Sequence, residues 1–438
     1  MRKMAFCCAV LGLLVLGSRA EATICTVDEV PAATLLLPYF QLDLSNPNGL
    51  TTLFSINNAS ATAVLAHVVV WSDLSVPVLD FNVYLTGYDV QSINLRDIIV
   101  NGVLPATASD GQDPADTISP QGQFSQDINF ASCNGVLPPP VLNSTYTTHL
   151  KNALTGLASP LLPPDAPCAG RPLGDNIARG YITVDTVNNC TLRFPGDVGY
   201  FATGGSGDAT NQNVLFGDFF YVNVEQNFAE GGPLVHIEAD ATNPETSVSG
   251  QYTFYGRYNN PAWTAADNRE PLATNFATRF LNGGAFSSGT NLIVWRDSKV
   301  AQASFACPAT LGVRPSWYPL GQEGLVIFDE EENPEVPATT PVSPQPIGSS
   351  LAPFPAETQR VQVGGTDFPV PFTFGWLYLD LNTTVAAAGT NPPEDPAAAQ
   401  AYVIAEYEAN GHFAAGVDAV KLDSACTAVH TFPGEMGE

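Results

Sequence analysis

Short apolar segments separated by turn clusters fill the stretch from residue 51 to residue 95. The segments at 51–57, 63–72, 78–85 and 89–95 are rich in Val, Ile, Leu and aromatic residues, while Asn, Asp, Ser and Gly gather between them. Segments of this length, repeated about every ten residues, are typical of antiparallel sheets rather than of a βαβ architecture. We therefore predict an all-β fold: an antiparallel β-sandwich, immunoglobulin-like in its N-terminal part, with a larger β-rich remainder.

Weaker patterns continue along the chain. Apolar residues three or four apart predict short helices at 144–158 and 267–281. The segment 331–359 is acidic and then proline-rich, as in a linker or a long surface loop. Further strands are expected at 180–187, 214–224, 234–239, 251–258, 291–295, 374–381, 402–408 and 412–422. The expected divisions are a signal peptide (1–22), an N-terminal sandwich (23–130), a β-rich middle region (131–330), the linker (331–359), a C-terminal β region (360–426) and a tail (427–438).

The first residues have the layout of a secretory leader. Arg2 and Lys3 precede an apolar run at 4–16, and Ala20-Glu21-Ala22 offers small residues where a signal peptidase cuts. We expect cleavage after Ala22, which predicts a secreted, extracellular or cell-surface protein, with the periplasm as an alternative. No later run of about 18 apolar residues follows, so no integral membrane contact is expected.

Acidic residues dominate the charge of the chain. The formal net charge is −27, and loss of residues 1–22 removes three basic residues and one acidic residue, which leaves −29. Such a surface repels the phosphates of nucleic acid, so no nucleic-acid partner is expected. Only 13% of the residues are charged and 45% are hydrophobic. This composition predicts a folded chain with a large core rather than a disordered acidic one.

Cysteine usage predicts disulfide bonds. Two of the eight cysteines lie in the expected leader. An even number in an exported chain indicates three disulfides with 15 possible pairings, and the wide spacing argues against a zinc site. Among the pairings, Cys133–Cys168 would enclose a proline-rich loop and Cys25–Cys426 would join the two ends, so we expect these two. The six remaining cysteines are Cys25, Cys133, Cys168, Cys190, Cys307 and Cys426.

One candidate metal site alternates along an expected strand. His236, Glu238 and Asp240 are two residues apart, so on a strand they share one face. An imidazole and two carboxylates on one face suit a transition metal or Ca²⁺. The alternative is a solvent-facing row opposite the buried apolar residues between them, which the same alternation predicts.

A second candidate lies in a polar loop. Asp110, Asp113 and Asp116 are three residues apart within Asp-Gly-Gln-Asp-Pro-Ala-Asp. Carboxylates in a flexible loop suit Ca²⁺, although the motif lacks the core of an EF-hand. A solvated turn is the alternative. Ca²⁺ is thus the one cofactor that the sequence suggests.

Basic residues are concentrated between positions 257 and 299. In a chain so acidic, we expect Arg257, Arg269 and their neighbours to pair with carboxylates such as Asp267, Glu270 and Asp297. A binding site for anions or uronic acids is the alternative.

Three stretches resemble uncharacterised secreted β-rich proteins of environmental bacteria. They are 53–97, Ala-Asp-Asn-Arg-Glu-Pro at 266–271, and Val-Trp-Arg-Asp-Ser-Lys at 294–299. The resemblance covers most of the mature chain and implies export and a β-rich fold. It implies no activity.

The sequence favours a structural or adhesive role outside the cell. It contains no H-E-x-x-H motif and no complete nucleophile elbow. We therefore expect a non-enzymatic β-sandwich protein, with Ca²⁺ as a candidate stabilising ion, whose partners are polysaccharide, cell-surface components or further copies of itself. One alternative is an extracellular carbohydrate-active hydrolase or lyase, which needs two suitably placed carboxylates. Another is a subunit of a secreted filament, joined through exposed strand edges.

Overall fold

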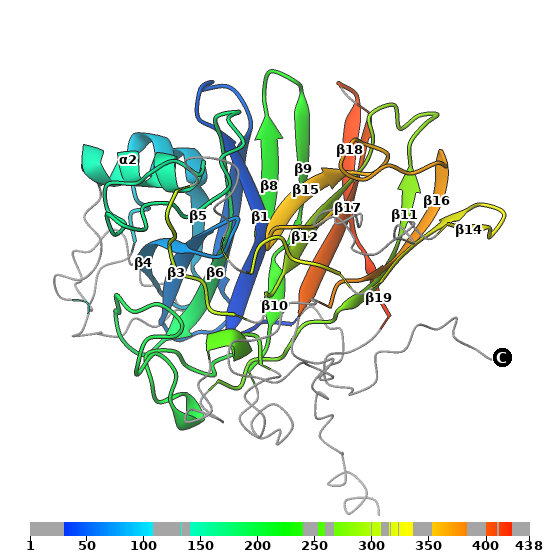
Figure 1. The fold of residues 1–438 in the computed structure, drawn as a ribbon. Coiled ribbons are helices and arrows are strands. Elements are labelled where there is room, and N and C mark those ends of the chain that lie inside the picture. The colour runs from blue at the N-terminus through cyan, green and yellow to red at the C-terminus, as the bar shows by residue number, and fades with distance from the viewer. Residues whose placement is uncertain are drawn as a thin grey trace, which may run out of the picture.

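A computed structural model shows a protein built mostly of antiparallel strands in four sheets (Figure 1). The all-β prediction is therefore confirmed. Helical structure is sparse in the described part and includes α2 (Ser144–Ala153) and the π-helical turn η1 (Asp97–Asn101). No helix among the described residues is long and apolar enough to cross a membrane. The structure describes residues 30–107, 133, 141–239, 253–258, 267–298, 300–307, 315, 317–322, 324–335, 353–382, 400–409 and 411–422.

The first two sheets face each other as a sandwich around a shared core. The first sheet has the order β10-β1-β6-β3-β4, and the second has the order β5-β2-β8-β9, with β7 also paired to β2. Both sheets combine strands from before and after residue 130. The strands are β1 (Thr34–Asp43), β2 (Thr51–Asn58), β3 (Val64–Ser72), β4 (Pro77–Leu85), β5 (Val90–Asn94), β6 (Ile177–Val187), β7 (Leu215–Phe216), β8 (Asp218–Asn223), β9 (Phe228–Pro233) and β10 (Val235–Ile237).

The other two sheets come from the C-terminal half of the chain. The third sheet has the order β15-β12-β17-β18 and the fourth has the order β14-β13-β16-β11-β19. β18 and β19 are consecutive in the chain but belong to different sheets, so the chain passes from the third sheet to the fourth between them. The strands are β11 (Asn275–Leu281), β12 (Gly289–Arg296), β13 (Gly324–Asp329), β14 (Pro334–Glu335), β15 (Thr358–Gln362), β16 (Phe374–Asp380), β17 (Ala401–Ala409), β18 (Phe413–Asp418) and β19 (Val420–Lys421).

The third sheet is a middle layer, and its central strands β12 and β17 are buried on both faces. On β12, Ile293 and Trp295 belong to the core of the first sandwich, while Leu292 and Val294 belong to the core shared with the fourth sheet. A strand covered on both sides reads as a continuous apolar run, as 292–295 does here. β17 alternates in the same way, so the two halves of the molecule pack through this sheet.

A bulge in β1 connects three sheets. Pro38 has no backbone N–H to give to a ladder, and the register of β1 against β6 shifts between Leu37 and Phe40. The carbonyl groups released there accept hydrogen bonds from elsewhere. Thr358 Oγ1 donates to Pro38 O at 2.5 Å, and Tyr221 Oη donates to Tyr39 O at 2.8 Å. The bulge therefore joins β1 to β15 of the third sheet and to β8 of the second.

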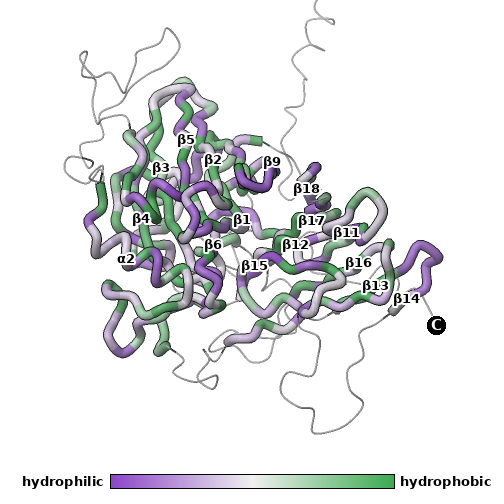
Figure 2. Tube along the Cα trace, turned by 90° about the horizontal axis from the view of Figure 1, so that it is seen from above, coloured by the Kyte–Doolittle hydropathy of each residue, from purple (hydrophilic) through white to green (hydrophobic). Residues whose placement is uncertain are grey.

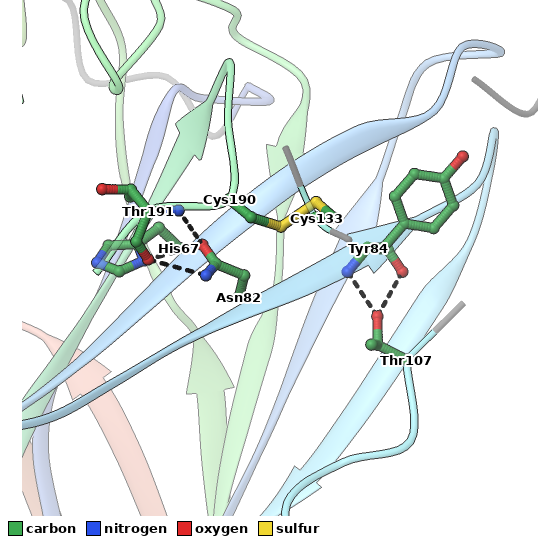
Figure 3. The surroundings of a disulfide bond; sticks show 7 residues. All are labelled: His67, Asn82, Tyr84, Thr107, Cys133, Cys190 and Thr191. Atoms are coloured by element: carbon green, nitrogen blue, oxygen red, sulfur yellow. Dashed lines mark hydrogen bonds between the residues drawn. A yellow bond between two sulfur atoms is a disulfide. The ribbon is translucent and has the colours of Figure 1, made fainter. Parts of the chain in front are cut away.

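Two disulfides cross-link the described residues, and the expected pairing Cys133–Cys168 is wrong. Cys133 is bonded to Cys190, and Cys168 to Cys307. The Asn82 amide exchanges hydrogen bonds with the backbone of Thr191, which holds Cys190 beside β4 (Figure 3). The expected pair Cys25–Cys426 lies outside the described residues, as does the expected leader.

An isolated antiparallel β-bridge brings Cys168 close to its disulfide partner Cys307. The backbone N–H and C=O of Cys168 both pair with those of Phe305, two residues before Cys307. A contact of this kind depends on the tertiary fold, so the chain spacing of the cysteines does not reveal it.

Replacing Cys168 and Cys307 together by Ala is expected to lower the free energy of unfolding by about 2–4 kcal/mol. The bond joins positions separated by 139 residues, so its loss frees a long loop in the unfolded chain. Guanidinium denaturation of the oxidised protein measures the change. The reduced wild-type protein should lose at least as much stability as the variant. Equal midpoints for the oxidised wild-type protein and the variant would contradict the prediction.

Two local predictions are wrong. The expected helix at 267–281 is an extended segment that ends in β11. Residues four apart share a face on a strand as well as on a helix. Phe276 and Phe280 lie on the same face of β11, and both are fully buried. The expected strand at 251–258 is a turn and a short 3₁₀ helix over its described residues, and within it the Asp267 carboxylate accepts the Tyr255 N–H at 3.2 Å.

Candidate carboxylate site between the second and third sheets

Three carboxylates meet where the second and third sheets adjoin. Edge strand β9 of the second sheet lies beside edge strand β18 of the third (Figures 1 and 2). Glu230 comes from β9, and Glu406 and Glu408 come from β17, where residues two apart share a face. One carboxylate oxygen from each residue lies within 4.8 Å of the others. We call these three residues the carboxylate cluster.

Arg360 reaches the cluster from the opposite edge of the third sheet. It is paired with Ile293 on β12, which is in turn paired with Ile404 on β17. The guanidinium crosses β12 diagonally, and its Nε lies 2.5 Å from Oε2 of Glu406. Its NH2 group also donates to Oε1 of Glu408. Three ionised carboxylates and this one guanidinium carry a net charge of −2.

Burial makes ionisation of the cluster costly. Burial first, and then the charge of Glu406, raise the pKa of Glu230 to about 9. Burial also raises the pKa of Glu406, although the charge of Arg360 opposes that effect. With no cation bound, Glu230 is therefore protonated at neutral pH, and its proton can be shared with Glu406.

When Glu230 and Glu406 are both ionised, two oxygens in the cluster have no hydrogen-bond donor among the described residues. They are Oε2 of Glu230 and Oε1 of Glu406, on residues that are only 6% and 1% exposed. Gly416 makes the close approach possible: a Cβ at this position, which is paired with Glu406, would lie 2.5 Å from Oε1 of Glu230. A side chain at position 416 of β18 would therefore displace the Glu230 carboxyl group.

A small hollow opens beside the cluster. Its volume is about 120 Å³, which admits several water molecules but not a sugar residue with its neighbours, since pockets for small organic ligands occupy about 300–1,000 Å³. The hollow is lined by Phe219, Tyr221, Glu230, Gly231, Gly232, Pro233, Ile404, Gly416 and Asp418.

The structure does not bring His236 to a metal centre within the residues it describes. Its Nδ1 lies 2.9 Å from Val30 O, and its Nε2 accepts the Gly217 N–H at 3.4 Å. Both ring nitrogens therefore face backbone groups, and neither is turned towards the carboxylate cluster. Glu238 is half-buried, and its carbonyl oxygen accepts the Glu270 N–H at 2.8 Å. The remaining candidates, Asp110, Asp113, Asp116 and Asp240, lie outside the described residues.

Two of the clustered arginines do pair with carboxylates. Arg269 lies 3.3 Å from Asp267, and Arg257 lies 3.5 Å from Asp297. Arg296 behaves differently, because its guanidinium donates to backbone carbonyl oxygens, including Phe354 O at 2.8 Å. The expectation of structural pairing is met for the first two.

Sequence reasoning did not find the carboxylate cluster. Glu406 and Glu408 alternate along a strand that was predicted, so their shared face could be read from the sequence. Glu230 gave no signal, because only the packing of two edge strands from different sheets brings it to them. Arg360 gave no signal either, because only the pairing of β15 and β17 with β12 brings it close to Glu406.

Comparison with known proteins adds little. No protein-family model matches the chain, and no curated protein matches it. A solved chain described as "Biofilm associated protein - BSP domain" aligns with 92% of this chain at 10% identity and a TM-score of 0.16. This chain spans 61% of that one. At such a TM-score the likeness supports no argument about fold or function. What the molecule itself defines is a disulfide-bonded, all-β protein with buried ion pairs.

Proposed function

We propose that this protein is an exported structural or adhesive protein that works outside the cell or at its surface, without catalytic activity. One observation carries the proposal: the buried guanidinium groups of Arg257 and Arg296 join sheets to one another. Disulfides that persist in an oxidising compartment support the export that the leader predicts.

The Arg257 network illustrates this use of polar groups. The NH1 group of Arg257 lies 3.0 Å from Oε2 of Glu357, a residue just before β15. The NH2 group of Arg257 donates to Tyr181 Oη of β6 at 3.2 Å. The guanidinium therefore links the first sheet to the third. Burial raises the pKa of Glu357, although the charge of Arg257 opposes this effect. These contacts hold the two sheets together, which supports a structural role.

The rival function, hydrolysis of a polysaccharide, finds only partial support. Glu230 and Glu406, two neighbouring carboxyl groups whose pKa values are raised by burial, supply the pair of carboxyl groups that a glycosidase needs. However, the adjoining hollow of about 120 Å³ does not accommodate a glycan chain. A second hollow of about 380 Å³ is lined by 60, 62–65, 187–188, 212 and 214, none of which is a carboxylate or a histidine.

Export and surface attachment can be measured directly. We expect the full chain, expressed in a bacterial host, to appear in the medium or on the cell surface as a product that begins after Ala22, as N-terminal sequencing would show. A chain lacking residues 1–22 is the control and should stay in the cytosol. The purified product should bind cells or abiotic surfaces and should release no sugar from a panel of polysaccharides. Retention of the full chain in the cytosol, or sugar release, would refute the proposal.

A further inference from the structure

We propose that Glu230, Glu406 and Glu408 hold a divalent cation, Ca²⁺, between the second and third sheets. The proposal goes beyond the structural role above, because it assigns a specific ligand to a site that the sequence did not indicate. It rests on four features of the cluster: the spacing of the oxygens, their lack of donors, their charge, and the room beside them.

The spacing of the oxygens suits one ion. Ca²⁺ binds oxygen at 2.3–2.6 Å, so two ligands of the same ion lie at most about 5 Å apart. One oxygen from each of the three carboxylates lies within 4.8 Å of the others. A single cation can therefore touch all three without a rearrangement of the strands that carry them.

The unsatisfied oxygens point to a missing positive partner. Glu230 and Glu406 are more than nine-tenths buried, and when both are ionised each has an oxygen with no donor among the described residues. A buried charged oxygen without a partner costs several kcal/mol. Arg360 contacts Oε2 of Glu406, which leaves Oε1 of the same carboxylate for another cation. These two oxygens belong to residues of different sheets, Glu230 of the second and Glu406 of the third.

The charge of the site matches a divalent ion. The three carboxylates and Arg360 sum to −2, so one divalent cation neutralises the group. Because the whole chain carries a net charge of −27, its field also attracts cations to this surface.

The type of ligand favours Ca²⁺ over other metals. The cluster offers only carboxylate oxygens, the ligands of hard cations, whereas zinc prefers sites that include nitrogen or sulfur. Ca²⁺ accepts irregular coordination by six to eight oxygens, while Mg²⁺ requires a nearly ideal octahedron. The hollow of about 120 Å³ beside Glu230 can hold the waters that complete the shell.

Calcium titration of the purified mature protein tests the proposal. After EDTA treatment and removal of the chelator, calorimetry at neutral pH should show one saturable Ca²⁺ site, and millimolar CaCl₂ should raise the melting temperature. MgCl₂ at the same concentration should have a smaller effect. Absence of both binding and a melting shift in correctly folded, disulfide-bonded protein would overturn the proposal, while leaving export and surface attachment untouched.

Paired variants locate the site. Glu230→Gln removes one ligand charge and should weaken Ca²⁺ binding by at least about tenfold. Glu225→Gln makes the same charge change at an exposed position that follows β8 and should bind as the wild type does. Gly416→Ala keeps all three carboxylates but displaces the Glu230 carboxyl, so it should also weaken binding. If either Glu230→Gln or Gly416→Ala is folded and binds Ca²⁺ with unchanged affinity, the ion is held elsewhere.

Discussion

Replacing Arg269 by Met is expected to lower the free energy of unfolding by about 3–5 kcal/mol. The Arg269 side chain is 1% exposed, and its Nε and NH1 lie 3.2 Å from Asp185 and 3.3 Å from Asp267. Methionine fills a similar volume but leaves both buried carboxylates without a counter-charge. Desolvated carboxylates of this kind must either take up protons or draw in water, and both cost stability.

Chemical denaturation of the oxidised protein measures the effect, and Arg193→Met is the matched control. Arg193 also pairs with an aspartate, Asp208, at 3.0 Å, but its side chain is 52% exposed. Exposed pairs contribute at most about 1 kcal/mol, so this variant should remain close to the wild type. Adding Asp185→Asn to Arg269→Met should recover part of the loss, because it removes one orphaned charge. Similar losses for the two arginine variants would show that burial of the pair does not matter.

The strands of the first sandwich could be predicted where the apolar pattern of the sequence matches the burial of the strand in the fold. The segment 63–72 is apolar at nearly every position, and β3 is buried along its whole length. β1 escaped prediction although it lies in the middle of the first sheet. Pro38 interrupts its apolar run, and a proline argues against a central strand unless a bulge accommodates it. Such a bulge is visible only once the neighbouring strands are in place.

β9 escaped prediction for a similar reason. Its sequence ends in Gly231-Gly232-Pro233, residues that locally favour a turn. A Cβ at Gly231 would lie 2.3 Å from Phe219 O, so the strand needs glycine there to approach β8. The glycine that makes this segment look like a turn in the sequence is thus also the residue that lets β9 pack against β8. Glu230 lies just before them, and its partners on β17 could not be found without this strand.

In calcium-free protein, raising the pH from about 6 to about 9 is expected to destabilise the wild type by up to about 1.4 kcal/mol per pH unit relative to Glu230→Gln. Glu230 keeps its proton in the folded state up to about pH 9, whereas its ordinary pKa is 4.5. Between these values unfolding releases a proton, so rising pH favours the unfolded chain, and the loss ends above the folded pKa. A glutamine at this position has no proton to lose, and its amide can donate to Glu406. The groups that face Glu230 are Glu406, Glu408, Arg360, Tyr221 and Asp418.

Denaturation curves in EDTA across this pH range, for the wild type and for Glu230→Gln, measure the difference. The variant should be the more stable protein at about pH 8, and the gap should widen as the pH rises. Saturating CaCl₂ should narrow the gap, because the cation replaces the proton on Glu230 and stabilises only the wild-type site. Glu225→Gln should run parallel to the wild type throughout, because its carboxylate is exposed. Parallel curves for the wild type and Glu230→Gln would mean that this carboxyl is already ionised in the folded protein, and that water or another donor reaches it where β9 meets β18.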